Sequence, residues 1–219
     1  MPFYRFFTRA REPMNSYTHF IGVLLALAGN PLSVLLYLWK GTGDPVRLLA
    51  ALIFCVSALA LYTTSCFYHY YTGSDAAIFR LRKLDHSMIY VLIAGSYTPM
   101  LMTFYPRREA LLFCGILWAV AAVGICVKVF WFTLPRWVST AIYLIMGWSI
   151  LFDLGPLTRM PAPAIALLAA GGISYTVGGV IYGLKKPNLF RRFGFHELFH
   201  CFVMLGTVLH YLVVALYIL

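Results

Sequence analysis

Hydrophobic residues run along most of the chain in long stretches, interrupted by short clusters of charged residues, proline and glycine. A helix that spans a bilayer needs about 20 mainly apolar residues. The pattern therefore predicts an all-α integral membrane protein with a bundle of seven transmembrane helices. Residues 1–17 form a short basic segment before this seven-transmembrane domain of residues 18–219. The predicted helices are residues 18–39, 46–71, 84–104, 110–130, 137–154, 162–184 and 196–218, of which the fifth is the shortest.

The composition supports the membrane assignment. Of the 219 residues, 62% are hydrophobic and 11% are charged, and the mean hydropathy is +0.82. Soluble domains carry about 25% charged residues. The five cysteines lie in apolar stretches, which indicates small buried side chains rather than a disulfide framework. The first 17 residues lack an apolar core of signal-peptide length, so the first membrane helix is expected to direct insertion.

The distribution of basic residues predicts the orientation. Cytoplasmic loops of membrane proteins carry an excess of Lys and Arg. With the N-terminus inside, the cytoplasmic side would hold twelve of the 17, namely Arg5, Arg9, Arg11, Arg80, Arg82, Lys83, Lys128, Arg136, Lys185, Lys186, Arg191 and Arg192. The outer side would hold the other five, namely Lys40, Arg47, Arg107, Arg108 and Arg159. We therefore expect a cytoplasmic N-terminus and an outer C-terminus. The net charge of +10 is then explained by anionic lipid headgroups, and no nucleic-acid partner is expected.

Polar and ionisable side chains gather at one depth. Such groups are costly inside a membrane, by about 2.5–3.5 kcal/mol for a central charge on insertion scales, and they mark functional sites. They fall at the cytoplasmic ends of the first, second, third and seventh predicted helices. Because basic loop residues alone set the topology, this agreement independently indicates a site near the cytoplasmic face. The residues are Glu12, Asn15, His19, His69, Asp85, His86, His196 and His200.

Three of the histidines have the spacing of metal ligands. His196 and His200 are four residues apart, about 40° around a helix and about 6 Å along it, so both imidazoles can face one ion. His69 would be the third ligand. Three histidines with an open fourth position suit a catalytic zinc. The alternative is a buried polar network that fixes helix packing through interhelical hydrogen bonds.

Two further residues are expected to act on the water at such a metal. Ser65 lies one turn before His69 and could hydrogen-bond a ligand or that water. Asp85 could orient the water as general base, or accept a hydrogen bond from an imidazole N–H.

The remaining polar residues are expected to support the site rather than bind the ion. Glu12, Asn15 and His19 share one helical face and are predicted to cap or brace it. His86 is interpreted as a hydrogen-bonding neighbour. His210 lies too far along the seventh helix to reach the same ion, which favours a packing role.

These residues form motifs that resemble the hemolysin III family, the bacterial branch of the progestin and adipoQ receptor family that includes the adiponectin receptors. The resemblance extends over nearly the whole chain. The motifs are Glu12-x-x-Asn15-x-x-x-His19; Ser65-x-x-x-His69 followed by Leu84-Asp85 and Gly95-Ser96-Tyr97-Thr98-Pro99; and His196-Glu197-Leu198-Phe199-His200 followed by His210.

The resemblance implies seven helices with the N-terminus inside, in a bacterial plasma membrane. It also implies zinc held by His69, His196 and His200, with Asp85 and Ser65 around its water. The family resembles membrane-embedded metal-dependent hydrolases such as alkaline ceramidases. Its bacterial branch is named for a haemolytic phenotype and has been connected with membrane lipid homeostasis.

Three functional hypotheses follow. The first is a zinc-dependent hydrolase of lipid amides or esters, whose partners are membrane lipids and whose substrate carries an acyl chain. The second is a non-enzymatic membrane-state sensor or receptor in which zinc is structural. The third is a cytolysin, although near-continuous apolar helices argue against a secreted pore-former. The sequence leaves open iron or manganese in place of zinc, and a homo-oligomeric state.

Overall fold

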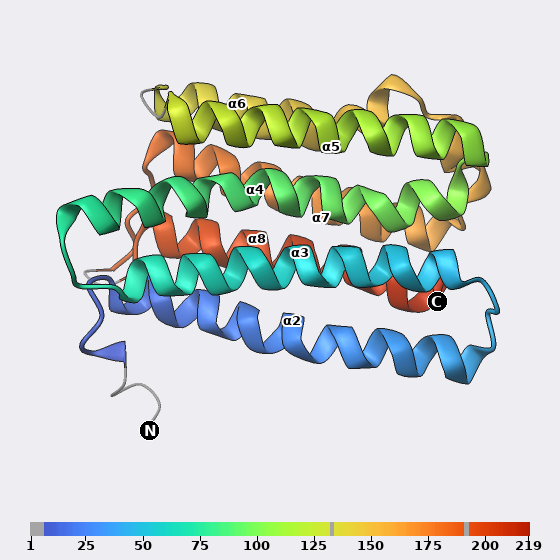
Figure 1. Ribbon diagram of the computed structural model, residues 1–219, viewed down its shortest axis with the longest axis horizontal. Helices are drawn as coiled ribbons and strands as arrows, with labels where there is room; N and C mark the ends of the chain where they lie inside the picture. Colours follow the sequence, from blue (N-terminus) through green and yellow to red (C-terminus); the bar gives the residue numbers. More distant parts are fainter. Residues whose placement is uncertain (1–6, 132–133, 191–192) are drawn as a thin grey trace.

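A computed structural model describes residues 7–131, 134–190 and 193–219, and its regular elements are helices. Arg5, Arg191 and Arg192, three of the basic residues that set the predicted orientation, lie outside the described residues. With the labels of Figure 1, the α-helices are α2 (Pro13–Lys40), α3 (Pro45–Tyr70), α4 (Asp75–Phe104), α5 (Arg107–Phe130), α6 (Arg136–Gly147), α7 (Ala162–Leu184) and α8 (Phe195–Val213).

The helices form an antiparallel bundle of two layers (Figure 1). Helices α2, α3, α4 and α5 follow one another across the front layer, and each packs against the next. Helices α8, α7 and α6 lie behind them, where α8 packs on α2 and α7, and α6 packs on α4 and α7. The chain enters at one end of the bundle and finishes toward the other. The end of α3 and the beginnings of α4 and α8 therefore lie at the same end of the bundle as the beginning of α2, which is called the N-terminal end below.

The outer surface of the bundle is strongly apolar. Large hydrophobic side chains are exposed on the long helices, such as Leu35 of α2 (62%), Leu112 of α5 (64%) and Leu184 of α7 (69%). Monomeric soluble proteins rarely expose a continuous apolar surface of this extent. Within the described residues, six helices are long and apolar enough to cross a membrane, namely α2, α3, α4, α5, α7 and α8 with its continuation to Ile218. The all-helical, multi-pass membrane prediction is confirmed at this level.

The predicted fifth helix, residues 137–154, differs from the structure. Helix α6 ends at Gly147, and two 3-10 turns follow at Ser149–Phe152 and Gly155–Arg159. The Tyr97 hydroxyl accounts for the interruption, because it donates to Gly147 O at 2.7 Å and accepts from Ile150 N at 3.0 Å. A side chain from α4 thus satisfies backbone groups that a continuous helix would pair internally.

Two helices begin earlier than the hydrophobic pattern predicts. Helix α2 begins at Pro13 rather than at residue 18, and α4 begins at Asp75 rather than at residue 84. Proline is favoured in the first turn of a helix because its missing N–H would have no partner there. The first turns of α4 are charged, so hydropathy marks where that helix enters the apolar layer and not where it starts. The basic residues Arg80 and Arg82 therefore lie on helix and not in a loop.

Candidate metal centre

Three histidines from two helices converge at the N-terminal end of the bundle. His69 is the penultimate residue of α3, and His196 and His200 lie in the first turns of α8. Their ligand nitrogens all lie within 4.8 Å of one another. The chain begins α8 just before this pair, because the Glu197 carboxylate accepts a hydrogen bond from Gly194 N at 2.8 Å. The pairing expected from sequence is thus present, and these three residues could hold one metal ion.

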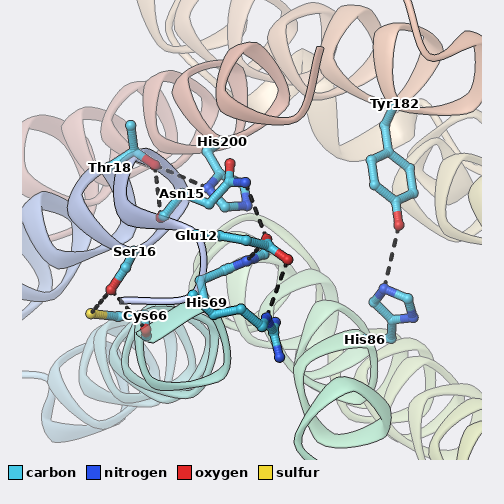
Figure 2. Close-up of polar contacts among 10 residues, drawn as sticks. Glu12, Asn15, Ser16, Thr18, Cys66, His69, His86, Tyr182 and His200 are labelled. Carbon is cyan, nitrogen blue, oxygen red and sulfur yellow. Dashed lines mark hydrogen bonds and ion pairs between the residues drawn. The ribbon is translucent and has the colours of Figure 1, made fainter. Parts of the chain in front are cut away.

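Glu12 orients the first histidine (Figure 2). Its carboxylate lies 2.5 Å from Nδ1 of His69, and its backbone N–H donates to His69 O at 3.0 Å. A carboxylate can only accept here, so Nδ1 carries the proton and Nε2 keeps its lone pair. That Nε2 is buried and has no hydrogen-bond partner among the described residues. An unpartnered nitrogen of this kind fits a metal ligand, and the carboxylate–histidine contact is typical of metal sites.

Thr18 orients a second histidine in the same way. The Thr18 hydroxyl donates its only proton to Asn15 O at 2.9 Å and lies 3.0 Å from Nδ1 of His200. The hydroxyl therefore accepts from Nδ1–H, and Nε2 of His200 is left with a lone pair for an ion. Thr18 was not singled out by the sequence analysis. A signal was present, since it is a polar residue one turn after Asn15 on a mostly apolar helix.

Asp85 and Ser65 lie beside the histidines. Asp85 is 8% exposed and Ser65 is 1% exposed. The Asp85 carboxylate interacts with the Ser65 side chain and electrostatically with His69. The structure therefore brings together the two residues that were expected to act on a metal-bound water.

Glu12 is held in its charged form. Partial burial would by itself raise the pKa of this carboxyl group, but its hydrogen bond with His69 and the charge of Arg11 lower the pKa to about 2. Arg11 Nε lies 3.4 Å from the other carboxylate oxygen. Glu12 is thus a carboxylate at neutral pH and remains an acceptor for the His69 N–H.

The other residues predicted to support the site occupy two places. The Asn15 amide donates to Glu12 at 3.3 Å, and His19 stacks on His200 with ring centroids 3.5 Å apart. His86 lies apart from these residues, and its Nε2 is 3.4 Å from the Tyr182 hydroxyl, as Figure 2 shows.

Comparison with known proteins identifies the family. The family model for haemolysin-III-related proteins matches residues 7–211. The chain belongs to the haemolysin III family. It is 35% identical to a hemolysin-3 homolog of Bacillus subtilis (strain 168), over 96% of each chain. It is 32% identical to hemolysin-3 of Bacillus cereus, over 95% of this chain and 92% of that protein. It is more weakly similar to the human monocyte to macrophage differentiation factor, with 25% identity over 93% of this chain and 83% of that protein.

In this haemolysin III family protein, a cavity of about 120 Å³ opens beside the histidines. Its polar wall includes Ser65, Asp85, His196 and His200. Most of the remaining wall is apolar or aromatic, and the cavity extends as far as His210, ten residues farther along α8. Ten residues of helix rise about 15 Å. The arrangement combines a polar end that can hold a metal with an apolar space beyond it.

His210 itself does not join the histidine cluster. Its Nε2 lies 3.2 Å from Leu168 O on α7, and its ring fills the space beside Gly171, where a Cβ would overlap it. Because a carbonyl only accepts, Nε2 of His210 carries the proton. The packing role expected from sequence agrees with these contacts.

Proposed function

We propose that this protein is a zinc-dependent hydrolase that cleaves lipid amides or esters in a bacterial plasma membrane and so takes part in membrane lipid homeostasis. The single observation that carries the proposal is the cluster of His69, His196 and His200, with Asp85 beside it, at the polar end of a largely apolar cavity. A structural zinc site is normally closed by four protein ligands, whereas a catalytic one keeps an open position. Three histidines leave such a position.

The nitrogen donors favour zinc. Imidazole suits zinc, copper, iron and nickel, whereas magnesium, calcium and manganese prefer oxygen ligands. Zinc, when bound here, would supply Lewis-acid polarisation of an acyl carbonyl and activation of water. Glu12 and Thr18 would fix the two imidazole rings through their Nδ1–H groups.

The residues of the chain would carry the proton transfer. The Asp85 carboxylate would accept a proton from water as the water oxygen attacks the acyl carbon, and it would return that proton to the departing amine or alcohol. Ser65 would hold the carboxylate in place through their side-chain contact. The apolar part of the cavity would receive the acyl chain.

Hydrolysis of a lipid panel by purified protein tests the proposal. Zinc-replete protein is expected to release fatty acid from at least one of a ceramide, a simple N-acyl amide and a phospholipid ester. Treatment with a zinc chelator should stop the release, and added zinc should restore it. Iron or manganese loading, assayed in parallel, would reveal a different metal preference.

We further propose seven spans, with the N-terminus inside, the C-terminus outside and the site near the cytoplasmic face. The excess of basic residues at the N-terminal end of the bundle supports this orientation. Figure 1 supports the count, because α6 and its 3-10 turns connect one end of the bundle to the other. A C-terminal reporter that is active only outside the cytoplasm should therefore score positive, and one that is active only inside should score negative. The reverse pattern would place the histidines at the outer face.

A cytolytic role is the candidate suggested by the printed names of the relatives, hemolysin-3 and hemolysin-3 homolog. The lipid-facing apolar surface of the bundle does not favour a soluble, secreted toxin. Release of lysophospholipid or another lipid product would give haemolysis as a consequence of hydrolysis. Lysis by a variant without turnover, at the rate of the parent protein, would favour a direct pore instead.

A further inference from the structure

Three basic side chains from three helices gather around His86, at the N-terminal end of the bundle. Arg82 lies one turn before His86 on α4, Lys128 is near the end of α5, and Arg136 is the first residue of α6. The positive charges of all three act on the His86 ring, and those of Arg82 and Lys128 act on each other. Like charges repel one another at such separations, so this arrangement favours a bound anion.

Lys128 belongs to the interior of the bundle and not to its surface. The residue is 2% exposed, and its Nζ donates to the Ser139 hydroxyl at 2.5 Å. The same ammonium group lies 6.0 Å from the centre of the Tyr143 ring, and the Tyr143 hydroxyl donates to His86 O at 3.0 Å. The serine hydroxyl and the aromatic ring are neutral, so the Lys128 charge adds to the positive potential around His86.

Arg136 presents a guanidinium nitrogen that lacks an acceptor. Its Cζ lies 4.6 Å from the centre of the Tyr182 ring and 5.7 Å from that of Phe195, so two aromatic rings hold the planar group. One terminal nitrogen, Nη1, is buried and has no hydrogen-bond partner in the described part of the chain. A guanidinium group only donates hydrogen bonds. The missing partner of Arg136 is therefore an acceptor.

The carboxylate of Asp85 does not balance these charges. It acts electrostatically on Arg82, but it also interacts with the Ser65 side chain and with His69. One negative charge that is already engaged at the candidate metal centre stands against three positive charges around His86. A phosphate group carries negative charge and only accepts hydrogen bonds, and it matches the geometry of a guanidinium group.

Two exposed tryptophans place the basic cluster at the level of the lipid headgroups. Trp131 directly follows α5 and is 66% exposed, and Trp137 is the second residue of α6 and is 68% exposed. Tryptophan is enriched where the hydrocarbon layer meets the aqueous phase. Lys128 and Arg136 are close to these two residues along the chain. A phospholipid of this leaflet can therefore bring its phosphate to the cluster while its acyl chains stay in the bilayer.

We propose that the phosphate group of an anionic phospholipid binds between α4, α5 and α6, at Arg82, Lys128 and Arg136. Basic pockets between transmembrane helices bind anionic headgroups in this way. The site is separate from the three histidines, and it depends neither on zinc nor on turnover. Tyr143 and Tyr182, which contact the basic side chains, also line the cavity. A headgroup that ties the three helices together thus stabilises the cavity wall.

Two phospholipids with the same acyl chains provide the test. Phosphatidylglycerol has a net negative charge, whereas phosphatidylcholine carries an ammonium group that the basic cluster repels. Full-length protein, freed of co-purified lipid in a neutral detergent, is expected to bind phosphatidylglycerol about tenfold to a hundredfold more tightly, as hydrogen bonds to charged groups allow. Phosphatidylglycerol should also raise the Tm more. Native mass spectrometry and thermal unfolding measure the two effects, and inorganic phosphate at the same concentration should produce neither.

Four variants locate the site. Arg136→Gln and Lys128→Met should each lower the affinity for phosphatidylglycerol by about tenfold or more. Arg136→Lys keeps the charge but loses the planar fork, so it should retain part of the preference. Arg80→Gln is the matched control, because it removes an exposed positive charge from the same end of α4 and should keep the whole preference. Since Lys128 is buried and its replacement can also disturb folding, the comparison of Arg136→Gln with Arg80→Gln decides.

Three results would contradict the proposal. Equal affinities and equal Tm shifts for the two lipids in the parent protein would overturn the site. Equal losses of preference in Arg80→Gln and Arg136→Gln would overturn it as well, because diffuse surface charge would then explain the preference. A rise in Tm with inorganic phosphate as large as that with phosphatidylglycerol, abolished in Arg136→Gln, would overturn the lipid assignment and identify a site for free phosphate.

Discussion

Alanine in place of His69, His196 or His200 is expected to remove zinc from the purified protein, which in its parent form should carry about one zinc per chain. The three ligand nitrogens lie within 4.8 Å of one another, and each substitution leaves two. The loss of affinity should exceed the about 10–100-fold that follows loss of an outer hydrogen-bond partner. Elemental analysis of detergent-purified protein measures the metal content directly.

Two controls belong to this measurement. His210→Ala removes another buried histidine of α8, whose Nε2 faces Leu168 O instead of the cluster, and it should leave zinc in place. Glu12→Gln weakens the hold on the His69 N–H without removing a ligand, so its effect should fall between those of His210→Ala and His69→Ala. Zinc loss in His210→Ala as complete as in His200→Ala would show that the ligand assignment is wrong.

The membrane class and the convergence of the histidines could be predicted from sequence for a simple physical reason. Hydrophobic length identifies spanning helices, and antiparallel connectivity then decides which helix ends share a depth. His69 ends one such helix and His196 begins another, so alternation alone brings them to the same end. The fourfold spacing of His196 and His200 places both on one face of α8. None of these steps requires knowledge of side-chain packing.

Three features that sequence reasoning missed depend on contacts between helices. The break after Gly147 follows from hydrogen bonds to Tyr97, which is 50 residues away along the chain. The orientation of His200 depends on Thr18, at a separation of 182 residues. Lys128 was counted among the cytoplasmic charges, yet it is 2% exposed and donates to the Ser139 hydroxyl at 2.5 Å. Hydropathy has no term for such pairings, because it treats each position alone.

Asp85→Asn is expected to keep zinc and near-normal thermal stability while turnover falls by about 10²–10⁴-fold, the usual contribution of a positioned proton acceptor. The amide has nearly the same shape as the carboxylate, so the contact with Ser65 and the packing around it should change little. The amide of Asp85→Asn, unlike the carboxylate that it replaces, cannot take a proton from water at neutral pH. Zinc content, Tm and the rate of lipid hydrolysis should be measured on the same preparation, with parent protein alongside.

The same substitution separates a hydrolase from a non-enzymatic sensor or receptor in which zinc is structural. A structural zinc site predicts no turnover in the zinc-replete parent protein. It also predicts a fall in Tm whenever zinc leaves, because metal binding energy contributes to folding. It also predicts zinc loss in Asp85→Asn if that carboxylate closes the site as a fourth ligand. Retained zinc and lost turnover together match only a residue that acts beside the metal. If the parent protein holds zinc but cleaves no ceramide, acyl amide or phospholipid ester, the hydrolase hypothesis is rejected. A structural zinc site is then the better explanation of three converging histidines.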